Sequence, residues 1–132
     1  RAIADAIVRT RTAGPITTTH QLAELVARVS YQKGRLHPAT KIFLALRIAV
    51  NDERNNLKSA LPQALSLLPA GGRLVVISFH EGEDRITKQF FKDQAMTKKA
   101  ILLTKKPLIP TPAEISANPR SRSAKLRALQ KI

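Results

Sequence analysis

The stretch GGRLVVISFHEGEDR, Gly71 to Arg85, decides how this chain folds. Two glycines precede an unbroken apolar run, which ends at a histidine followed by three acids and an arginine. Apolar residues without alternation are typical of a strand that is covered on both faces, as in a parallel sheet. We therefore predict a buried strand from Arg73 to Phe79, with His80 at its carboxyl-terminal tip.

Helical patterns precede this strand. A short helix is predicted to end at Gly14-Pro15, and a second begins at Thr18, which forms a capping box with Gln21. Residues 39–53 are apolar on two sides, which predicts a helix between two layers. Pro62 interrupts the next apolar stripe and should kink that helix or start a new one.

The pattern after the strand alternates between helix and strand. We predict a helix beyond Gly82 to about Ala95, a strand from Ala100 to Thr104, a helical turn in TPAEISANP and a last strand from Ala124 to Ile132. This order is typical of the second half of a doubly wound α/β sheet. Ligands in such sheets bind at the carboxyl ends of the strands, which places His80 on the ligand side.

The acids that follow His80 have two interpretations. Glu81, Glu83 and Asp84 fit the first turn of the next helix, where the helix dipole favours negative charge. A metal site made of His80, Glu81 and Asp84 is the alternative, but the spacing matches no strong metal signature, and we expect no metal. His80 itself is a candidate pocket residue, or a residue that only ties down the loop.

Composition narrows the classes of function. The chain has 132 residues and a net charge of +14, which favours a polyanionic partner such as nucleic acid over a merely soluble basic surface. With no cysteine it can form neither a disulfide nor a thiolate metal site. No apolar run approaches the ~18 residues of a membrane span, and the chain begins without a signal-peptide pattern, so we expect a cytoplasmic location.

The candidate contacts to a polyanion are basic side chains and their neighbours. In NPRSRS, Arg120 and Arg122 can form bidentate bonds to phosphates while Ser121 and Ser123 add hydrogen bonds, unless the two arginines are only solvated loop charges. Further candidates lie elsewhere in the chain: His37, Arg47, Arg85 and Lys88. His37 could instead cap the helix that follows, and Arg47 could be a paired structural charge.

Three longer motifs resemble a known family. HPATKIFLALRIAVNDE (37–53), GGRLVVISFHEGEDRITKQFF (71–91) and NPRSRSAKLRA (118–128) together resemble the bacterial ribosomal RNA cytosine-N4 methyltransferases of the MraW/RsmH type. The resemblance covers essentially the whole chain, and three motifs in the family's order are more specific than any short pattern. The chain departs from the family at Glu81-Gly82, where members usually carry Ser-Leu.

The resemblance implies a fold and a reaction. Residues 52–132 would be the C-terminal half of a class I (Rossmann-like) methyltransferase sheet, preceded by residues 1–51 as an incomplete helical substrate-recognition segment. The reaction would transfer a methyl group from S-adenosylmethionine to N4 of a cytidine in the decoding region of 16S ribosomal RNA. The partner would be small-subunit ribosomal RNA or the ribosomal subunit.

The glycine-rich cofactor turn of that family has no counterpart in this sequence. None of the five glycines lies in a strand–GxGxxG–helix unit. We therefore expect a truncated fragment that is inactive alone and exposes apolar surface, with dimerisation or aggregation as a consequence. Two classes of function remain: part of an rRNA methyltransferase, or a non-catalytic basic module that binds RNA or the ribosome.

Overall fold

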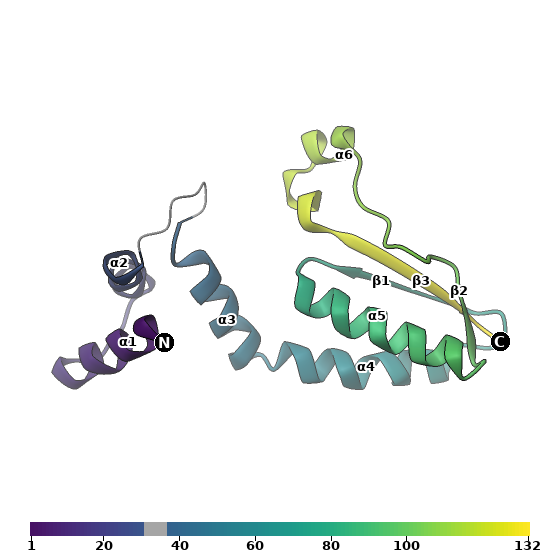
Figure 1. The fold of residues 1–132 in the computed structure, drawn as a ribbon, viewed down its shortest axis with the longest axis horizontal. Coiled ribbons are helices and arrows are strands. Elements are labelled where there is room, and N and C mark those ends of the chain that lie inside the picture. The colour runs from purple at the N-terminus through teal and green to yellow at the C-terminus, as the bar shows by residue number, and fades with distance from the viewer. Residues whose placement is uncertain (31–36) are drawn as a thin grey trace. The chain divides into compact units, whose positions relative to one another are not determined.

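The computed structural model describes residues 1–30 and 37–132 (Figure 1). These residues form two compact units, Arg1–Asn51 and Asp52–Ile132. Most of the loop predicted in YQKGRLHP, including Tyr31, lies outside the described residues. None of the described helices is both long and apolar enough to span a membrane.

The first unit contains α1 (Ala2–Ala13), α2 (Thr19–Val29) and α3 (Thr40–Val50). The capping box that the sequence predicted is confirmed. Thr18 Oγ1 accepts a hydrogen bond from Gln21 N at 3.2 Å, and Gln21 Oε1 accepts one from Thr18 N at 3.1 Å. The helices α1 and α2 pack together, and each buries one apolar residue, Ala6 and Val26.

The helix α3 is less buried than its sequence suggested. No residue of α3 is fully buried, and Val50 is 82% exposed. The helix itself is confirmed, but its burial between two layers is wrong for the described residues. Apolar residues on two sides of a helix show that both sides can be buried. They do not show that the first unit contains elements that bury both sides.

The second unit alternates helices and strands around one sheet. Its elements in chain order are α4 (Glu53–Leu67), β1 (Arg73–Ser78), α5 (Glu81–Met96), β2 (Ala100–Leu102), α6 (Pro112–Ala117), the 3₁₀ helix η1 (Pro119–Ser123) and β3 (Lys125–Lys131). These positions follow the sequence prediction closely. Pro62 lies inside α4, which continues through it as one helix. The core joins α4, α5, β2 and β3 through Leu61, Leu65, Phe91, Ala100 and Leu129.

The sheet has the strand order β1-β3-β2, and β3 pairs antiparallel with both neighbours. The register runs from Arg73 opposite Gln130 to Ser78 opposite Lys125. The mixed α/β fold is confirmed, but a parallel pairing of the opening strand is wrong, since β1 pairs only with β3 among the described strands. An apolar run predicts burial and contains no information about the direction of the partner strand. Because β1 and β2 both oppose β3, they run parallel to each other with α5 as their connection.

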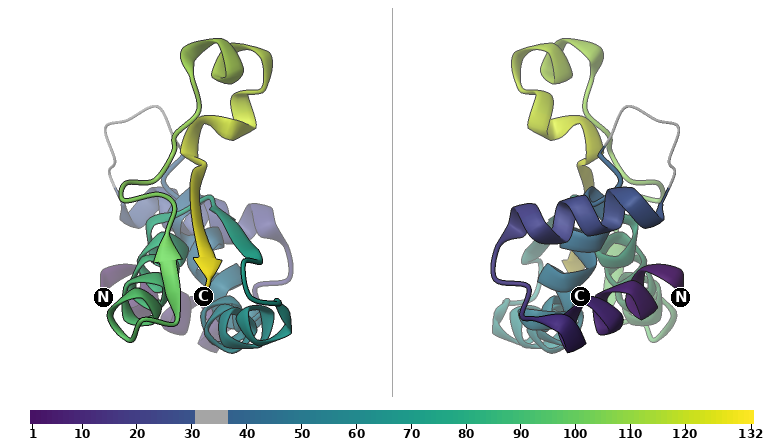
Figure 2. Two further views of the ribbon diagram at one scale, coloured as in Figure 1. Left: turned by 90° about the vertical axis from the view of Figure 1, so that its right-hand side faces the viewer. Right: turned by 90° about the vertical axis from the view of Figure 1, so that its left-hand side faces the viewer.

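One face of the sheet is covered and the other is largely open. The helices α4 and α5 lie on the same side of the strands, on the face that carries Leu74 and Val76 (Figure 2). On the opposite face Val75, Ile77 and Phe79 are each more than half exposed. The prediction of an interior strand covered on both faces is therefore wrong for this chain as described. The apolar run supplies two apolar faces, and the second unit covers one of them.

The turn between α4 and β1 requires both of its glycines. Gly71 has a φ of 80°, in the left-handed region that side chains disfavour. A Cβ on Gly72 would lie 2.9 Å from the carbonyl oxygen of Pro69 and 3.0 Å from Cβ of Leu68. The turn is therefore closely packed, and the start of β1 is fixed by a backbone that only glycine fits.

Replacing Gly72 by alanine should therefore destabilise the second unit. We expect Gly72→Ala to lower its free energy of unfolding by about 1–3 kcal/mol, because the backbone must shift to admit the methyl group. Hydrogen exchange of the β1 and β3 amides measures this loss. Gly14→Ala is the matched control, since nothing lies within 4 Å of its added Cβ; equal exchange in both variants would contradict the steric explanation.

Candidate nucleic-acid interface

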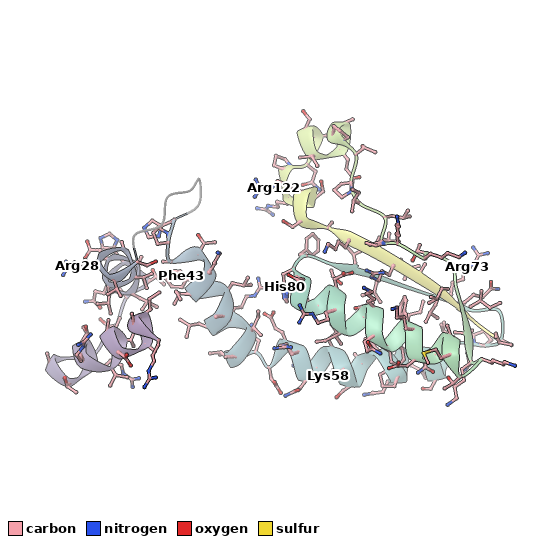
Figure 3. All side chains as sticks on the ribbon, viewed as in Figure 1. Arg28, Phe43, Lys58, Arg73, His80 and Arg122 are labelled. Carbon is pink, nitrogen blue, oxygen red and sulfur yellow. The ribbon has the colours of Figure 1, made fainter. Side chains whose placement is uncertain are left out.

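The sheet register collects several candidate residues at one end. Ser78, near the end of β1, lies opposite Lys125, the first residue of β3. His80 follows β1 by two residues, and η1 with Arg120 and Arg122 directly precedes β3. Figure 3 shows His80 and Arg122 at this end of the sheet and Arg73 at the other. We call this end, formed by residues 79–85 and 118–125, the strand-tip surface.

His80 is held at the strand-tip surface as the N-cap of α5. Its Nδ1 accepts a hydrogen bond from Glu83 N at 3.3 Å. Glu83 in turn bends back, and its Oε2 accepts a hydrogen bond from Phe79 N at 2.9 Å. Both bonds satisfy backbone donors that a helix start or strand end leaves free. The loop-tying interpretation of His80 is thus present in the structure, and a role in a pocket stays a prediction.

The other ring nitrogen of His80 faces two carboxylates. Nε2 is buried and lies 3.2 Å from Glu83 Oε1 and 3.9 Å from Glu53 Oε2. These three side chains form the one group among the described residues with the spacing of metal ligands. Because Nδ1 accepts a hydrogen bond, however, a neutral imidazole carries its proton on Nε2 and cannot offer a lone pair there to a metal. Nε2 is therefore a buried donor close to two carboxylates, and it makes no hydrogen bond to the described residues.

The acids in the first turn of α5 do not converge on one point, as a shared metal site would require. Glu81 Oε1 accepts a hydrogen bond from Arg85 at 2.9 Å on the exposed face of α5. Asp84 turns the other way, toward the sheet, and pairs with Arg127. The sequence prediction that these acids occupy the first turn of a helix is confirmed.

The arginines of η1 are free to contact a ligand, whereas one of their serines is not. Arg120 and Arg122 are exposed, and neither has an acid partner among the described residues. Ser121 is buried, and its hydroxyl donates to the carbonyl oxygen of Asn118 at 2.8 Å. That bond shapes the turn that presents the two arginines, so we leave Ser121 out of the proposed phosphate contacts. Ser123 is exposed beside Arg122.

The remaining candidates are spread over both units. Lys88 is exposed on α5 one turn after Asp84. In the first unit, His37 Nδ1 accepts a hydrogen bond from Ala39 N at 3.2 Å, just before α3. This bond lies before the helix, and α3 has no side-chain cap hydrogen bond at its N-cap Ala39, so the capping alternative for His37 is not met. Arg47 is exposed on α3. The structure thus brings His80, Arg85, Arg120 and Arg122 to one end of the second unit, with His37 and Arg47 in the first.

The pairing of Asp84 with Arg127 was not foreseen from the sequence. Arg127 Nε donates to Asp84 Oδ1 at 2.7 Å and Nη2 donates to Oδ2 at 3.1 Å, and both side chains are at least nine-tenths buried. Lys125 Nζ lies 3.7 Å from the same carboxylate. The two partners are separated by 43 residues. The one sign of this pair in the sequence was Arg127, a charged residue in the middle of the strand predicted from Ala124 to Ile132.

This environment lowers the pKa of the Asp84 carboxyl group. The hydrogen bonds from Arg127 are the largest cause, burial acts in the opposite direction, and the charges of Arg127, Lys125 and Lys88 lower the pKa further. A lowered pKa means that the ionised carboxylate stabilises the folded state. That stabilisation is complete above the unfolded-state pKa of about 3.9 and is lost as the pH falls through the folded-state value.

Comparisons with known proteins agree with the motifs. Residues 1–132 match the sequence model of the MraW methylase family. The chain belongs to this family. It is 53% identical over 131 residues to the ribosomal RNA small subunit methyltransferase H of Coprothermobacter proteolyticus, covering 99% of this chain and 44% of that protein. It is likewise 53% identical over 130 residues to the protein of that name from Solibacter usitatus, covering 98% of this chain and 44% of the relative.

A third relative extends the same result. The ribosomal RNA small subunit methyltransferase H of Thermomicrobium roseum is 50% identical over 147 residues, covering 99% of this chain and 45% of that protein. The chain therefore spans less than half the length of these MraW-family relatives. The family resemblance expected from the three sequence motifs is confirmed.

Removing the Asp84 carboxylate should cost this MraW-family chain much of its stability. We expect Asp84→Asn to lower the free energy of unfolding by about 3–5 kcal/mol at pH 7, because it leaves the buried Arg127 charge without a partner. Below pH 4 the difference from the parent chain should shrink, because the unfolded parent then binds a proton at Asp84 and the folded parent binds it only at lower pH. Urea unfolding followed by circular dichroism at pH 7 and pH 3 measures both effects.

The exposed pair on the same helix provides the control. Glu81→Gln removes the partner of Arg85 at the surface and should change stability by less than about 0.5 kcal/mol. A loss in Asp84→Asn no larger than in Glu81→Gln would contradict a structural role for the buried pair.

Proposed function

We propose that this chain is part of an S-adenosylmethionine-dependent ribosomal RNA methyltransferase that methylates N4 of a cytidine in the decoding region of 16S rRNA. The supporting observation is the identity of 50% or more, over nearly the whole chain, to proteins named ribosomal RNA small subunit methyltransferase H. The strand-tip surface adds physical support, because exposed cations are what a phosphate backbone binds.

The second unit is proposed to be the C-terminal half of a class I methyltransferase sheet. Two features support this proposal. β1 and β2 run parallel with α5 as a helical connection, which is the repeating unit of a doubly wound sheet, and many such sheets include an antiparallel strand like β3. β1 also has an apolar face and one edge that no described strand or helix covers. Residues 1–51 are proposed to be the helical substrate-recognition segment.

Methylation of an exocyclic amine makes specific demands on a protein. The N4 lone pair is delocalised into the cytosine ring, so the amine must be oriented toward the methyl donor and relieved of a proton. The base must also leave its stack to reach the site. In this chain Arg120 and Arg122 would hold phosphates beside the extruded base. His80, fixed by the cap on α5, would form part of the pocket wall, with its Nε2 turned toward Glu83 and Glu53.

The described residues do not fit the cofactor itself. A glycine-rich turn that follows a strand would let the backbone approach S-adenosylmethionine. Here β1 is followed by His80 and by three acids in the first turn of α5, and Gly71 and Gly72 precede the strand. We therefore assign no cofactor contact to this chain and derive no step through the cofactor.

The chain alone should accordingly behave as an RNA-binding module. We predict that residues 1–132 bind S-adenosylmethionine too weakly to be measured by isothermal titration calorimetry at 100 μM protein, a working limit of roughly millimolar affinity. The longer relative from Coprothermobacter proteolyticus is the positive control. A micromolar dissociation constant for this chain would contradict the assignment and show that a cofactor site lies within it.

The η1 arginines should carry part of the RNA affinity. We predict that Arg120→Ala combined with Arg122→Ala weakens binding to short RNA regardless of sequence, because both side chains contact phosphates. If each arginine neutralises one phosphate, the slope of log affinity against log salt falls by about 1.4 for single strands. Fluorescence anisotropy across a salt series measures the affinity and the slope together.

The control for this variant removes the same charge elsewhere. Lys105→Ala combined with Lys106→Ala deletes two exposed cations between β2 and α6 and should change the slope less. An unchanged slope in the arginine variant would remove the phosphate role of η1.

A further inference from the structure

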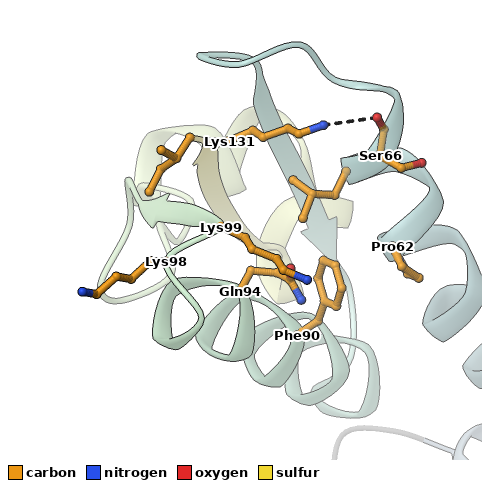
Figure 4. Close-up of a pocket in the computed structure, with 9 residues that line it drawn as sticks. Pro62, Ser66, Phe90, Gln94, Lys98, Lys99 and Lys131 are labelled. Carbon is orange, nitrogen blue, oxygen red and sulfur yellow. Dashed lines mark hydrogen bonds between the residues drawn. The ribbon is translucent and has the colours of Figure 1, made fainter.

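A second basic feature lies at the opposite end of the second unit. A hollow of about 520 Å³ opens where α4, α5 and the end of β3 meet, and its lining includes Phe90, Gln94, Lys98, Lys99 and Lys131 (Figure 4). Its volume falls within the roughly 300–1,000 Å³ range of small-molecule sites. Phe90 lies ten residues and Gln94 fourteen residues after His80, which is about 15–21 Å along the axis of α5, so the hollow is distinct from the strand-tip surface.

The three lysines around this hollow are not equivalent. Lys131 Nζ is already engaged, since it donates to the carbonyl oxygens of Ser66 at 3.2 Å and Leu68 at 2.6 Å. Lys99 extends toward Phe90 and Gln94, while Lys98 stands at the rim and points outward (Figure 4). Neither Lys98 nor Lys99 has an acid partner among the described residues. Two cations at the mouth of one hollow are thus available to an anion.

The backbone at Lys98 is in an unfavourable conformation for a lysine. Lys98 has a φ of 55°, in the left-handed region, and directly follows the end of α5. Glycine or asparagine is the usual residue at such a position, because a side chain there is strained. Lys99 N then closes the helix end with a hydrogen bond to Gln94 O at 2.9 Å.

The lining of the hollow offers more than charge. Phe90 is half-buried and is held by Phe91, which is only 2% exposed; their ring centroids are 6.3 Å apart at an angle of 57°. Phe90 also packs against the apolar core of the unit and is partly exposed beside the hollow. The amide of Gln94 has no hydrogen-bond partner among the described residues, and an amide can both donate to and accept from a base edge.

We propose that this hollow, defined by Phe90, Gln94, Lys98 and Lys99, binds one nucleotide of single-stranded RNA. The phosphate contacts Lys99 and Lys98, the base packs on the ring of Phe90, and Gln94 hydrogen-bonds to the edge of the base. Aromatic rings beside cations are the usual means of binding unpaired nucleotides. This inference rests on the proposed function, and it adds a second RNA contact on the same unit, toward the C-terminal end of α5.

A simpler interpretation assigns the lysines to the end of α5 alone. Cations near a helix C-terminus interact favourably with the dipole, and this would need neither Phe90 nor a ligand. The two interpretations differ in what the aromatic ring does. Only the nucleotide site requires the ring for RNA affinity, and only the nucleotide site prefers a nucleotide to inorganic phosphate as a competitor.

The experiment compares four variants of the 132-residue chain by fluorescence anisotropy with a labelled, unstructured 8-nucleotide RNA. Lys98→Ala combined with Lys99→Ala should lower the affinity about fivefold at 0.1 M salt and reduce the salt slope by about 0.7, because the two lysines share one phosphate. Phe90→Leu should lower the affinity about fivefold or more with an unchanged slope, because it removes stacking and leaves the charges. Phe90→Tyr keeps the ring and should bind like the parent chain.

The fourth variant is Lys105→Ala combined with Lys106→Ala, and thermal unfolding of every variant confirms that it is folded. Affinities of the lysine and Phe90→Leu variants equal to this control would overturn the proposal. A loss in the lysine variant alone, with cytidine monophosphate and inorganic phosphate competing equally, would overturn the base contact. The double variant Arg120→Ala, Arg122→Ala is measured in the same assay. If the lysine and Phe90→Leu variants lose affinity and the arginine variant does not, the result supports the nucleotide site in the hollow and contradicts the strand-tip role in the proposed function.

Discussion

The two hydrogen bonds between Arg127 and Asp84 fix the first turn of α5 to the middle strand of the sheet. The same turn begins with His80, so the position of that imidazole depends on the buried pair as well as on its own cap. β3 carries Arg127 inside the sheet and continues directly from η1, which presents Arg120 and Arg122. A single buried ion pair therefore sets the geometry of both halves of the strand-tip surface.

Burial of this ion pair costs hydration energy, and that cost explains why the pairing is bidentate. A buried guanidinium and carboxylate lose their hydration, and only good geometry with further hydrogen bonds compensates for this loss. The pairing is bidentate, and Lys125 adds a second cation at 3.7 Å. Such a pair contributes little net stability compared with apolar residues, but it is intolerant of losing one partner. It is thus suited to specifying where α5 begins relative to β3, which is what a binding surface at that point requires.

The sequence was most informative where the structure depends on local chemistry. The capping box at Thr18 and Gln21, the turn at Gly71-Gly72 and the acids at the start of α5 all follow from backbone requirements within a few residues. The direction of strand pairing was not predictable, because the apolar run of β1 fits either direction. The Asp84–Arg127 pair joins residues that only the fold brings together. The burial of Ser121 likewise depends on the fold of η1, and the hollow beside Phe90 is assembled from three separate segments.

The central claim is that the strand-tip surface binds RNA. The most direct test is a titration of the ¹⁵N-labelled chain with a short unstructured RNA, followed residue by residue through amide chemical shifts. The account predicts that, within the second unit, the largest changes fall in residues 79–85 and 118–125, with smaller changes near Lys98 and Lys99. Changes confined to the exposed apolar face around Val75 and Ile77, or no saturable change at the strand tip, would contradict it.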